Sequence, residues 1–194
     1  GRDALEAATQ IMKTLYRLRK GFAAVKSGTP GIEHPSLTIG LIQGGINTNV
    51  VPDKVVFRLD RRMIPEEDPS KVESELTVQI LRAAMGREGI SCQVRRILLA
   101  SPFKPVAGQE RLVDAIRRRA RDVLGEEPRA HGVPLYTDAR HYSAAGIPSV
   151  LYGAGPRTPL EANAHRADER LNLDDLRKAT EIVALAAADL LEAR

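Results

Sequence analysis

The sequence predicts an α/β protein with two parts, because helices and strands alternate in the first half and helices alternate with short apolar strands in the second. The chain has 194 residues, of which 43% are hydrophobic, and this is enough to build a substantial core. A proline-containing break at residues 101–105 interrupts the pattern. We therefore expect one domain over residues 1–104 and a second over residues 105–194.

Two amphipathic helices are expected in the first part. The pair Asp3 and Glu6 is typical of a helix start, and apolar residues at helical spacing continue to about Gly21. A second helix should begin at Asp68 and Pro69, because aspartate is a good N-cap and proline suits the first helical turn. Its buried face would consist of Val72, Leu76, Ile80, Ala83 and Ala84.

Three strands complete the first part, at residues 37–41, 54–62 and 92–99. In the second of these, Phe57 and Leu59 share one face, which leaves Asp60 and Arg62 on the other. The order helix, strand, strand, helix, strand lacks only an initial strand to form a ferredoxin-like β-α-β-β-α-β unit. We therefore expect a ferredoxin-like unit whose first strand would precede Gly1, in a chain that is part of a longer one.

The second part should contain helices at residues 109–124 and 138–145 and from residue 172 onward, with a short buried strand at 149–152. This pattern indicates α/β layering, but it supplies too few strands for a free-standing sheet. We expect the rest of that sheet to come from chain outside this sequence.

Composition excludes several classes of function. The net charge is only +4, with 29 basic and 25 acidic residues, and the basic runs at 95–96 and 117–121 lack aromatic neighbours, which argues against nucleic-acid binding. A sheet that binds RNA would need surface aromatics, and the strand at 54–62 offers only Phe57. No apolar run reaches membrane-spanning length. The single cysteine, Cys92, and the absence of a signal-like N-terminus favour a cytoplasmic location.

His165 is the strongest candidate metal ligand. It lies in a long loop after the expected strand at 149–152, where α/β proteins commonly place functional groups, although a surface histidine without a role is equally compatible with that position. Zinc requires three or four protein ligands, and no paired histidine or cysteine motif accompanies it. We interpret His34, His131 and His141 as surface or hydrogen-bonded histidines.

Several short motifs occur in a characteristic order. They are Gly-Gly-Ile-Asn-Thr-Asn-Val-Val-Pro at 44–52, Asp-Arg-Arg at 60–62 before Pro65, Thr-Asp-Ala-Arg at 137–140, Gly-Ile-Pro at 146–148, Gly-Ala-Gly-Pro at 153–156, and Ala164-His165 with Glu169. In this order and spacing they resemble the zinc amidohydrolase and metallopeptidase family of acetylornithine deacetylase, succinyl-diaminopimelate desuccinylase, aminoacylase and glutamate carboxypeptidase.

The resemblance implies a fold and an activity. Residues 1–104 would be a ferredoxin-like lid through which such enzymes usually form homodimers, and residues 105–194 the C-terminal portion of an α/β zinc-hydrolase domain. The complete enzyme would hold two zinc ions, with cobalt as a possible substitute, and cleave the amide bond of N-acyl amino acids or peptides that carry a free carboxylate. His165 would be the last zinc ligand. The other ligands, the general base and the catalytic lid histidine would lie before Gly1, so this chain would contain no catalytic residue and be inactive alone.

The resemblance also implies a set of substrate-binding residues. Asn49 and Arg62 would hold the substrate carboxylate, for which a guanidinium fork is well suited. Arg61, on the opposite strand face, is the competing candidate, and a simple surface pair between Arg62 and Asp60 is the structural alternative. Thr137, Arg140 and Gly153 are secondary candidates. Thr137 could instead cap a helix, and Gly153 could serve a tight turn.

A different class of function is also compatible with the sequence. A sheet that lacks a strand leaves an open edge, and such an edge can pair with another chain. The chain by itself could therefore be a dimerisation or interaction module without catalysis.

Overall fold

The structure is a computed structural model that describes residues 2–156 and 159–192. It forms two compact units. Unit 1 comprises Gly1–Pro102 with Gly132–Pro134, and unit 2 comprises Phe103–His131 with Leu135–Arg194. The chain passes from one unit to the other at residues 102–103, close to the expected boundary at 104–105. The short return to unit 1 was not predicted, and there the Gly132 amide donates to the Pro30 carbonyl oxygen over 2.7 Å.

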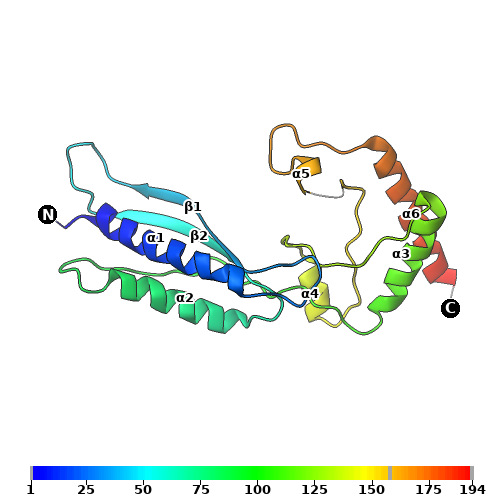
Figure 1. The fold of residues 1–194 in the computed structure, drawn as a ribbon, viewed down its shortest axis with the longest axis horizontal. Coiled ribbons are helices and arrows are strands. Elements are labelled where there is room, and N and C mark those ends of the chain that lie inside the picture. Colours follow the sequence, from blue (N-terminus) through cyan, green and yellow to red (C-terminus); the bar gives the residue numbers. More distant parts are fainter. Residues whose placement is uncertain (1, 157–158, 193–194) are drawn as a thin grey trace. The chain divides into compact units, whose positions relative to one another are not determined.

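Unit 1 places two helices against a two-stranded antiparallel sheet (Figure 1). The helices are α1 (Ala4–Gly21), followed by the short 3-10 helix η1 (Phe22–Ala24), and α2 (Pro69–Ala84); the strands are β1 (Ser36–Gly44) and β2 (Val55–Arg62). The buried side chains between these layers form one apolar core, made of Ile11, Leu15, Phe22, Leu37, Ile80 and Ala84. This core fixes the strands beneath the helices.

Local caps explain where both helices begin. The Asp3 carboxylate accepts hydrogen bonds from the amides of Leu5 and Glu6 at 2.9 and 3.0 Å, and the Asp68 carboxylate accepts from the Lys71 amide at 2.8 Å. Each carboxylate satisfies amide groups that lack a partner in the first helical turn. The two helix starts predicted from the sequence are confirmed.

The sheet has one apolar and one polar face. Phe57 and Leu59 pack against the core, whereas Asp60 and Arg62 are exposed, as the alternation along β2 predicts. Ser36 lies opposite Arg62 at one end of the pairing and Gly44 lies opposite Val55 at the other, with a shift in register between Ile39 and Leu41. The polar face of β2 therefore presents side chains to solvent.

The strand predicted at residues 92–99 is wrong, because these residues have no strand structure. Cys92 packs partly against the core, and this burial raises the pKa of its thiol, but Ile97 and Leu98 are 68% and 62% exposed. A strand needs a neighbour that receives its backbone hydrogen bonds. The sheet in the described part of the chain contains only β1 and β2, so the complete ferredoxin-like arrangement stays a prediction.

Unit 2 is built around two packed helices, α3 (Gln109–Leu124) and α6 (Leu173–Glu192). Five small or branched side chains are buried in these helices: Ala115, Ala120, Ala179, Ile182 and Ala186. The alanines allow close approach of the helix backbones. Two short helices, α4 (Ala139–Ala144) and α5 (Pro159–Ala162), lie in the connection between α3 and α6 (Figure 1).

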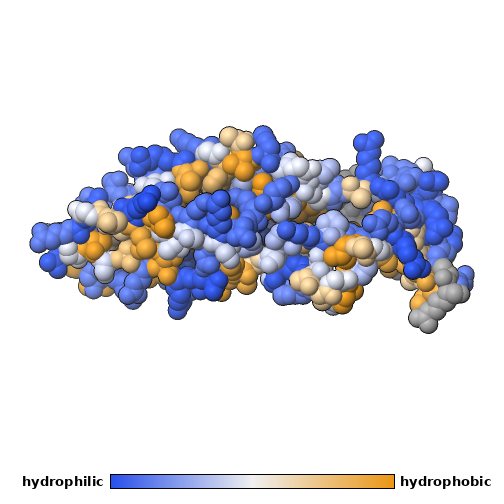
Figure 2. Space-filling model, turned by 90° about the horizontal axis from the view of Figure 1, so that it is seen from below, coloured by the Kyte–Doolittle hydropathy of each residue, from blue (hydrophilic) through white to orange (hydrophobic). Residues whose placement is uncertain are grey.

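The strand predicted at 149–152 is also wrong, since these residues lack strand structure. Leu151 is 52% exposed, and the part of unit 2 that the structure describes contains no strand to pair with it. Apolar side chains are also found on the surface, where hydrophobic and hydrophilic groups are mixed on the face shown in Figure 2. Among the described residues, no helix is both long and apolar enough to cross a membrane.

Candidate functional site

The two neighbouring arginines of β2 have different environments. Arg61 is only 10% exposed, and its Nη2 lies 2.5 Å from Oε1 of Glu67. Its guanidinium also lies over the Phe22 ring, 4.3 Å from the centroid. A cation in such a position is held by its carboxylate partner and by the aromatic face. Arg61 is therefore part of the packing of unit 1 and is poorly placed to receive a ligand.

Arg62 is half exposed on the polar face of the sheet. Its Nε lies 2.5 Å from Oδ2 of Asp60, and the two side chains are 50% and 59% exposed. This is the surface pair that the sequence offered as the structural alternative. However, the structure gives neither Nη atom of Arg62 a hydrogen-bond partner among the described residues. The outer end of the guanidinium can therefore still receive a carboxylate.

Asn49 lies at the opposite end of the hairpin from Arg62. It belongs to the exposed turn between β1 and β2, where the Asn47 side chain accepts from the Thr48 amide at 2.7 Å. Arg62 is the last residue of β2, seven residues beyond Val55. At about 3.3 Å per residue, that strand alone spans about 23 Å. The structure therefore does not bring Asn49 and Arg62 of one chain together around the same carboxylate.

His165 is exposed on the loop that follows α5. Its backbone has a φ angle of 65°, and its amide donates to Oε2 of Glu169 over 3.2 Å. The structure assigns its ring no hydrogen bond with a described residue, unlike His34 and His131. Their Nδ1 atoms lie 2.9 Å from the Pro35 carbonyl oxygen and 3.1 Å from that of Arg129. As far as the described residues are concerned, the imidazole of His165 is thus available to a ligand.

The described residues do not form a complete zinc site. Within residues 2–156 and 159–192, no group of three or more histidine, cysteine, aspartate or glutamate side chains could hold a metal ion. The imidazole of His165 suits one ligand position, because zinc commonly binds neutral histidine nitrogen. A complete site would need further ligands from outside the described residues.

Thr137 and Arg140 are placed around the start of α4. Thr137 Oγ1 accepts from the Ala139 amide at 3.2 Å, although the N-cap residue of α4 is Asp138 and not Thr137. Arg140 stacks on Tyr136, 4.9 Å from the ring centroid, and donates to the Tyr136 hydroxyl. Its Nε is buried and has no hydrogen-bond partner within residues 2–156 and 159–192. A buried donor without a partner costs free energy, so the Nε atom of Arg140 is the unusual feature of this region.

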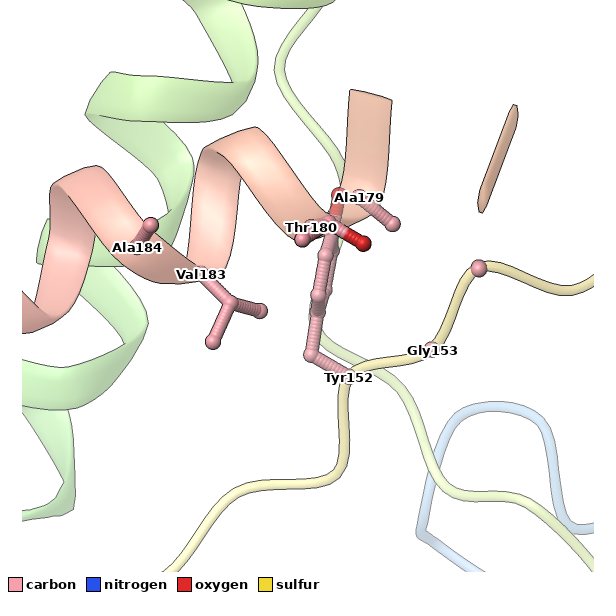
Figure 3. Close-up of a pocket in the computed structure, with 7 residues that line it drawn as sticks. Tyr152, Gly153, Ala179, Thr180, Val183 and Ala184 are labelled. Carbon is pink, nitrogen blue, oxygen red and sulfur yellow. The ribbon is translucent and has the colours of Figure 1, made fainter. Parts of the chain in front are cut away.

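Gly153 lines a shallow apolar cavity of about 390 Å³ beside α6 (Figure 3). The Tyr152 ring stands against Ala179 and Thr180, and its burial raises the pKa of the phenol. A Cβ atom added to Gly153 would meet only the Gly155 amide nitrogen, at 3.9 Å. Nothing in the described structure therefore requires glycine there for space. Its substrate role stays a prediction.

Sequence reasoning missed two features of these sites. One is Glu67, whose contact with Arg61 depends on the turn after β2. The other is the set of side-chain contacts around His165, in which Nδ2 of Asn163 donates to Oδ1 of Asp168. The residue types at 163 and 165 could have indicated an unusual loop backbone, since asparagine and histidine adopt positive φ more readily than most residues.

Comparisons with known proteins agree on one family. Residues 8–189 match the sequence model of the family described as Peptidase family M20/M25/M40. Human aminoacylase-1 is 28% identical over 173 residues, which are 87% of this chain and 41% of that protein. Succinyl-diaminopimelate desuccinylase of Corynebacterium glutamicum is 29% identical over 144 residues, 72% of this chain and 34% of the relative. The chain thus spans less than half the length of these relatives.

Solved structures show the same fold. Human carnosine dipeptidase 1 superposes with a TM-score of 0.65 at 21% identity, covering 79% of this chain and 33% of that one. The M20 family metallo-carboxypeptidase Sso-CP2 of Sulfolobus solfataricus gives a TM-score of 0.54 at 23% identity, covering 93% and 45%.

Proposed function

The chain belongs to peptidase family M20/M25/M40, and from this premise we propose that it is the C-terminal part of a zinc-dependent amide hydrolase. The substrates would be N-acyl amino acids or peptides with a free carboxylate. Relatives named aminoacylase and desuccinylase support hydrolysis of an acyl amide bond. The structural observation that carries the proposal is the exposed His165 ring, which has no hydrogen bond to a described residue.

His165 would contribute one imidazole nitrogen to the metal centre. When bound, zinc would supply Lewis acidity at the scissile carbonyl and lower the pKa of water. Two ions, which cobalt could replace, would need further ligands and a general base from the longer protein. Nothing in this chain is proposed as the general base.

Arg62 would orient the substrate through its carboxylate. Nε is already bonded to Asp60, so the two Nη atoms would form the fork that receives the substrate. We prefer Arg62 to the alternative, Arg61, because the contacts of Arg61 with Glu67 and Phe22 support a structural role for that arginine. We do not propose Asn49 for the same carboxylate within one chain, because it lies at the other end of the hairpin from Arg62. Thr137, Arg140 and Gly153 stay secondary candidates in unit 2.

The activity can be tested by comparing this chain with the protein extended upstream by the sequence that would precede Gly1. We expect the extended, zinc-loaded protein to hydrolyse N-acetyl amino acids, and to act poorly on the same compounds with an amidated carboxyl group. The isolated chain should show no turnover. Hydrolysis by the isolated chain, or equal rates on acid and amide, would contradict the proposal.

A second candidate function is dimerisation or interaction without catalysis. It is favoured by one observation: each strand of the described sheet has a strand neighbour on one side only. Free edges of this kind pair readily with other chains. Light scattering at increasing concentration should reveal a homodimer, and a monomer throughout the range would count against both the module and the dimeric lid.

A further inference from the structure

We propose that Glu169, together with the Asn163–Asp168 pair, is a positioning device that holds the His165 backbone in the conformation needed to present its ring. The inference rests on the ligand role proposed above for His165. It adds residues that act through His165 and touch neither substrate nor metal.

The backbone around His165 is in an uncommon conformation. Asn163 and His165 both have positive φ, at 55° and 65°, and the other described residues with positive φ are all glycines. This left-handed region is disfavoured for most side chains and persists where surrounding contacts enforce it. Two such residues flanking Ala164 indicate that this loop is held in place.

Hydrogen bonds at the base of the loop and within it hold the backbone in this conformation. The Arg170 amide donates to the Ala162 carbonyl oxygen over 3.0 Å, which closes the loop at its base. Within it, Nδ2 of Asn163 donates to Oδ1 of Asp168, and the His165 amide donates to Oε2 of Glu169 over 3.2 Å. Both bonds join the first segment of the loop, residues 163–165, to the second, residues 168–169.

The Glu169 bond acts on the His165 backbone and the Asn163–Asp168 bond joins two side chains, so neither involves the His165 ring. Ligand histidines are often oriented by a partner on the second ring nitrogen, whereas here Glu169 holds the amide of the same residue. The ring can then bind through either nitrogen without first breaking a bond to a described residue. Because the backbone is already fixed, less conformational entropy is lost when the ring binds a ligand.

Amide hydrogen exchange on the isolated chain tests the loop contact. Glu169→Ala should accelerate exchange at His165, while Glu169→Gln, which keeps an acceptor oxygen, should restore most of the protection. Glu75→Ala, at an exposed glutamate on α2, is the matched control and should leave His165 unchanged. Equal exchange in the wild type and Glu169→Ala would overturn the proposed contact.

Zinc affinity of the upstream-extended protein tests the role. Loss of an outer partner of a ligand typically weakens metal binding about 10-fold or more. We expect this loss for Glu169→Ala and recovery in Glu169→Gln, with an altered visible spectrum of the cobalt-substituted Glu169→Ala protein. Unchanged affinity in Glu169→Ala beside a clear loss in His165→Ala would refute the positioning role alone. No effect of His165→Ala would instead refute the proposed function.

Discussion

At the scale of single residues, Arg61 and Arg62 show how adjacent positions on one strand acquire different roles. Strand alternation sends Arg61 toward Phe22 and Glu67 and leaves Arg62 in solvent beside Asp60. Arg61 is largely buried, so its charge needs the carboxylate of Glu67 nearby. The pair of Arg62 and Asp60 is exposed, so solvent weakens its contribution to stability. The two arginines should therefore respond differently to substitution.

We expect Arg61→Ala to lower the free energy of unfolding by about 2 kcal/mol, because Glu67 would be left partly buried without its cation. Arg62→Ala should cost less than about 1 kcal/mol, as is usual for exposed pairs. In the extended enzyme, Arg62→Ala should raise KM for substrates with a free carboxylate. Urea unfolding and steady-state kinetics measure the two effects, and equal destabilisation by both substitutions would contradict the assignment.

The alternation of β2 was enough to place Arg62 on the polar face, and this much of the candidate site could be predicted from the sequence. The separation of Asn49 from Arg62 could not, because motif order does not reveal which ends of a hairpin two residues occupy. The loop contacts of His165 likewise depend on backbone angles that residue types only favour.

At the scale of secondary-structure elements, helices were predicted better than strands. The starts of α1 and α2 depend on local caps at Asp3 and Asp68, and such caps are visible in the sequence. The predicted strands at 92–99 and 149–152 depended on neighbours that the described chain does not provide. Apolar alternation alone therefore could not decide their structure.

The contact between α3 and α6 should be sensitive to side-chain volume. Ala120 is fully buried, so Ala120→Leu would force the helices apart and destabilise the protein by about 1–3 kcal/mol. Ala188→Leu, at an exposed position of α6, provides the control and should change stability little. Thermal or urea unfolding compares the two, and a neutral Ala120→Leu would show that the helices are not closely packed there.

An ion pair between these helices should make stability depend on pH. Hydrogen bonding to Arg119, with the charge of that arginine, lowers the pKa of Asp189. Because the folded pKa is below the unfolded value, the pair stabilises the protein above about pH 4 and loses this effect as pH falls through the folded pKa. Asp189→Asn should therefore destabilise at pH 7 and match the wild type in strong acid.

The control for this pH dependence is Asp114→Asn, at an exposed carboxylate on α3. Its stability should follow that of the wild type across the same pH range. Urea unfolding between pH 2 and 7 measures both variants, and a constant difference between Asp189→Asn and the wild type would show that the ion pair is not responsible.

At the scale of the whole molecule, the chain divides into two units that carry different parts of the proposed machinery. Unit 1 presents Arg62 on its sheet, and unit 2 presents His165 on a loop. Family membership covers residues 8–189, while the chain spans 41% of human aminoacylase-1. Under the proposed function, unit 2 would contribute one ligand, His165, to the metal site, and unit 1 would contribute the carboxylate-binding Arg62.

The central claim is most directly tested by the zinc content of purified protein, measured by mass spectrometry of the metal. The isolated chain should retain no stoichiometric zinc after dialysis, because its described residues offer no three-ligand group. The upstream-extended protein should retain zinc, and His165→Ala should reduce that content. Tight stoichiometric zinc in the isolated chain, or full zinc content in the extended His165→Ala protein, would contradict the account.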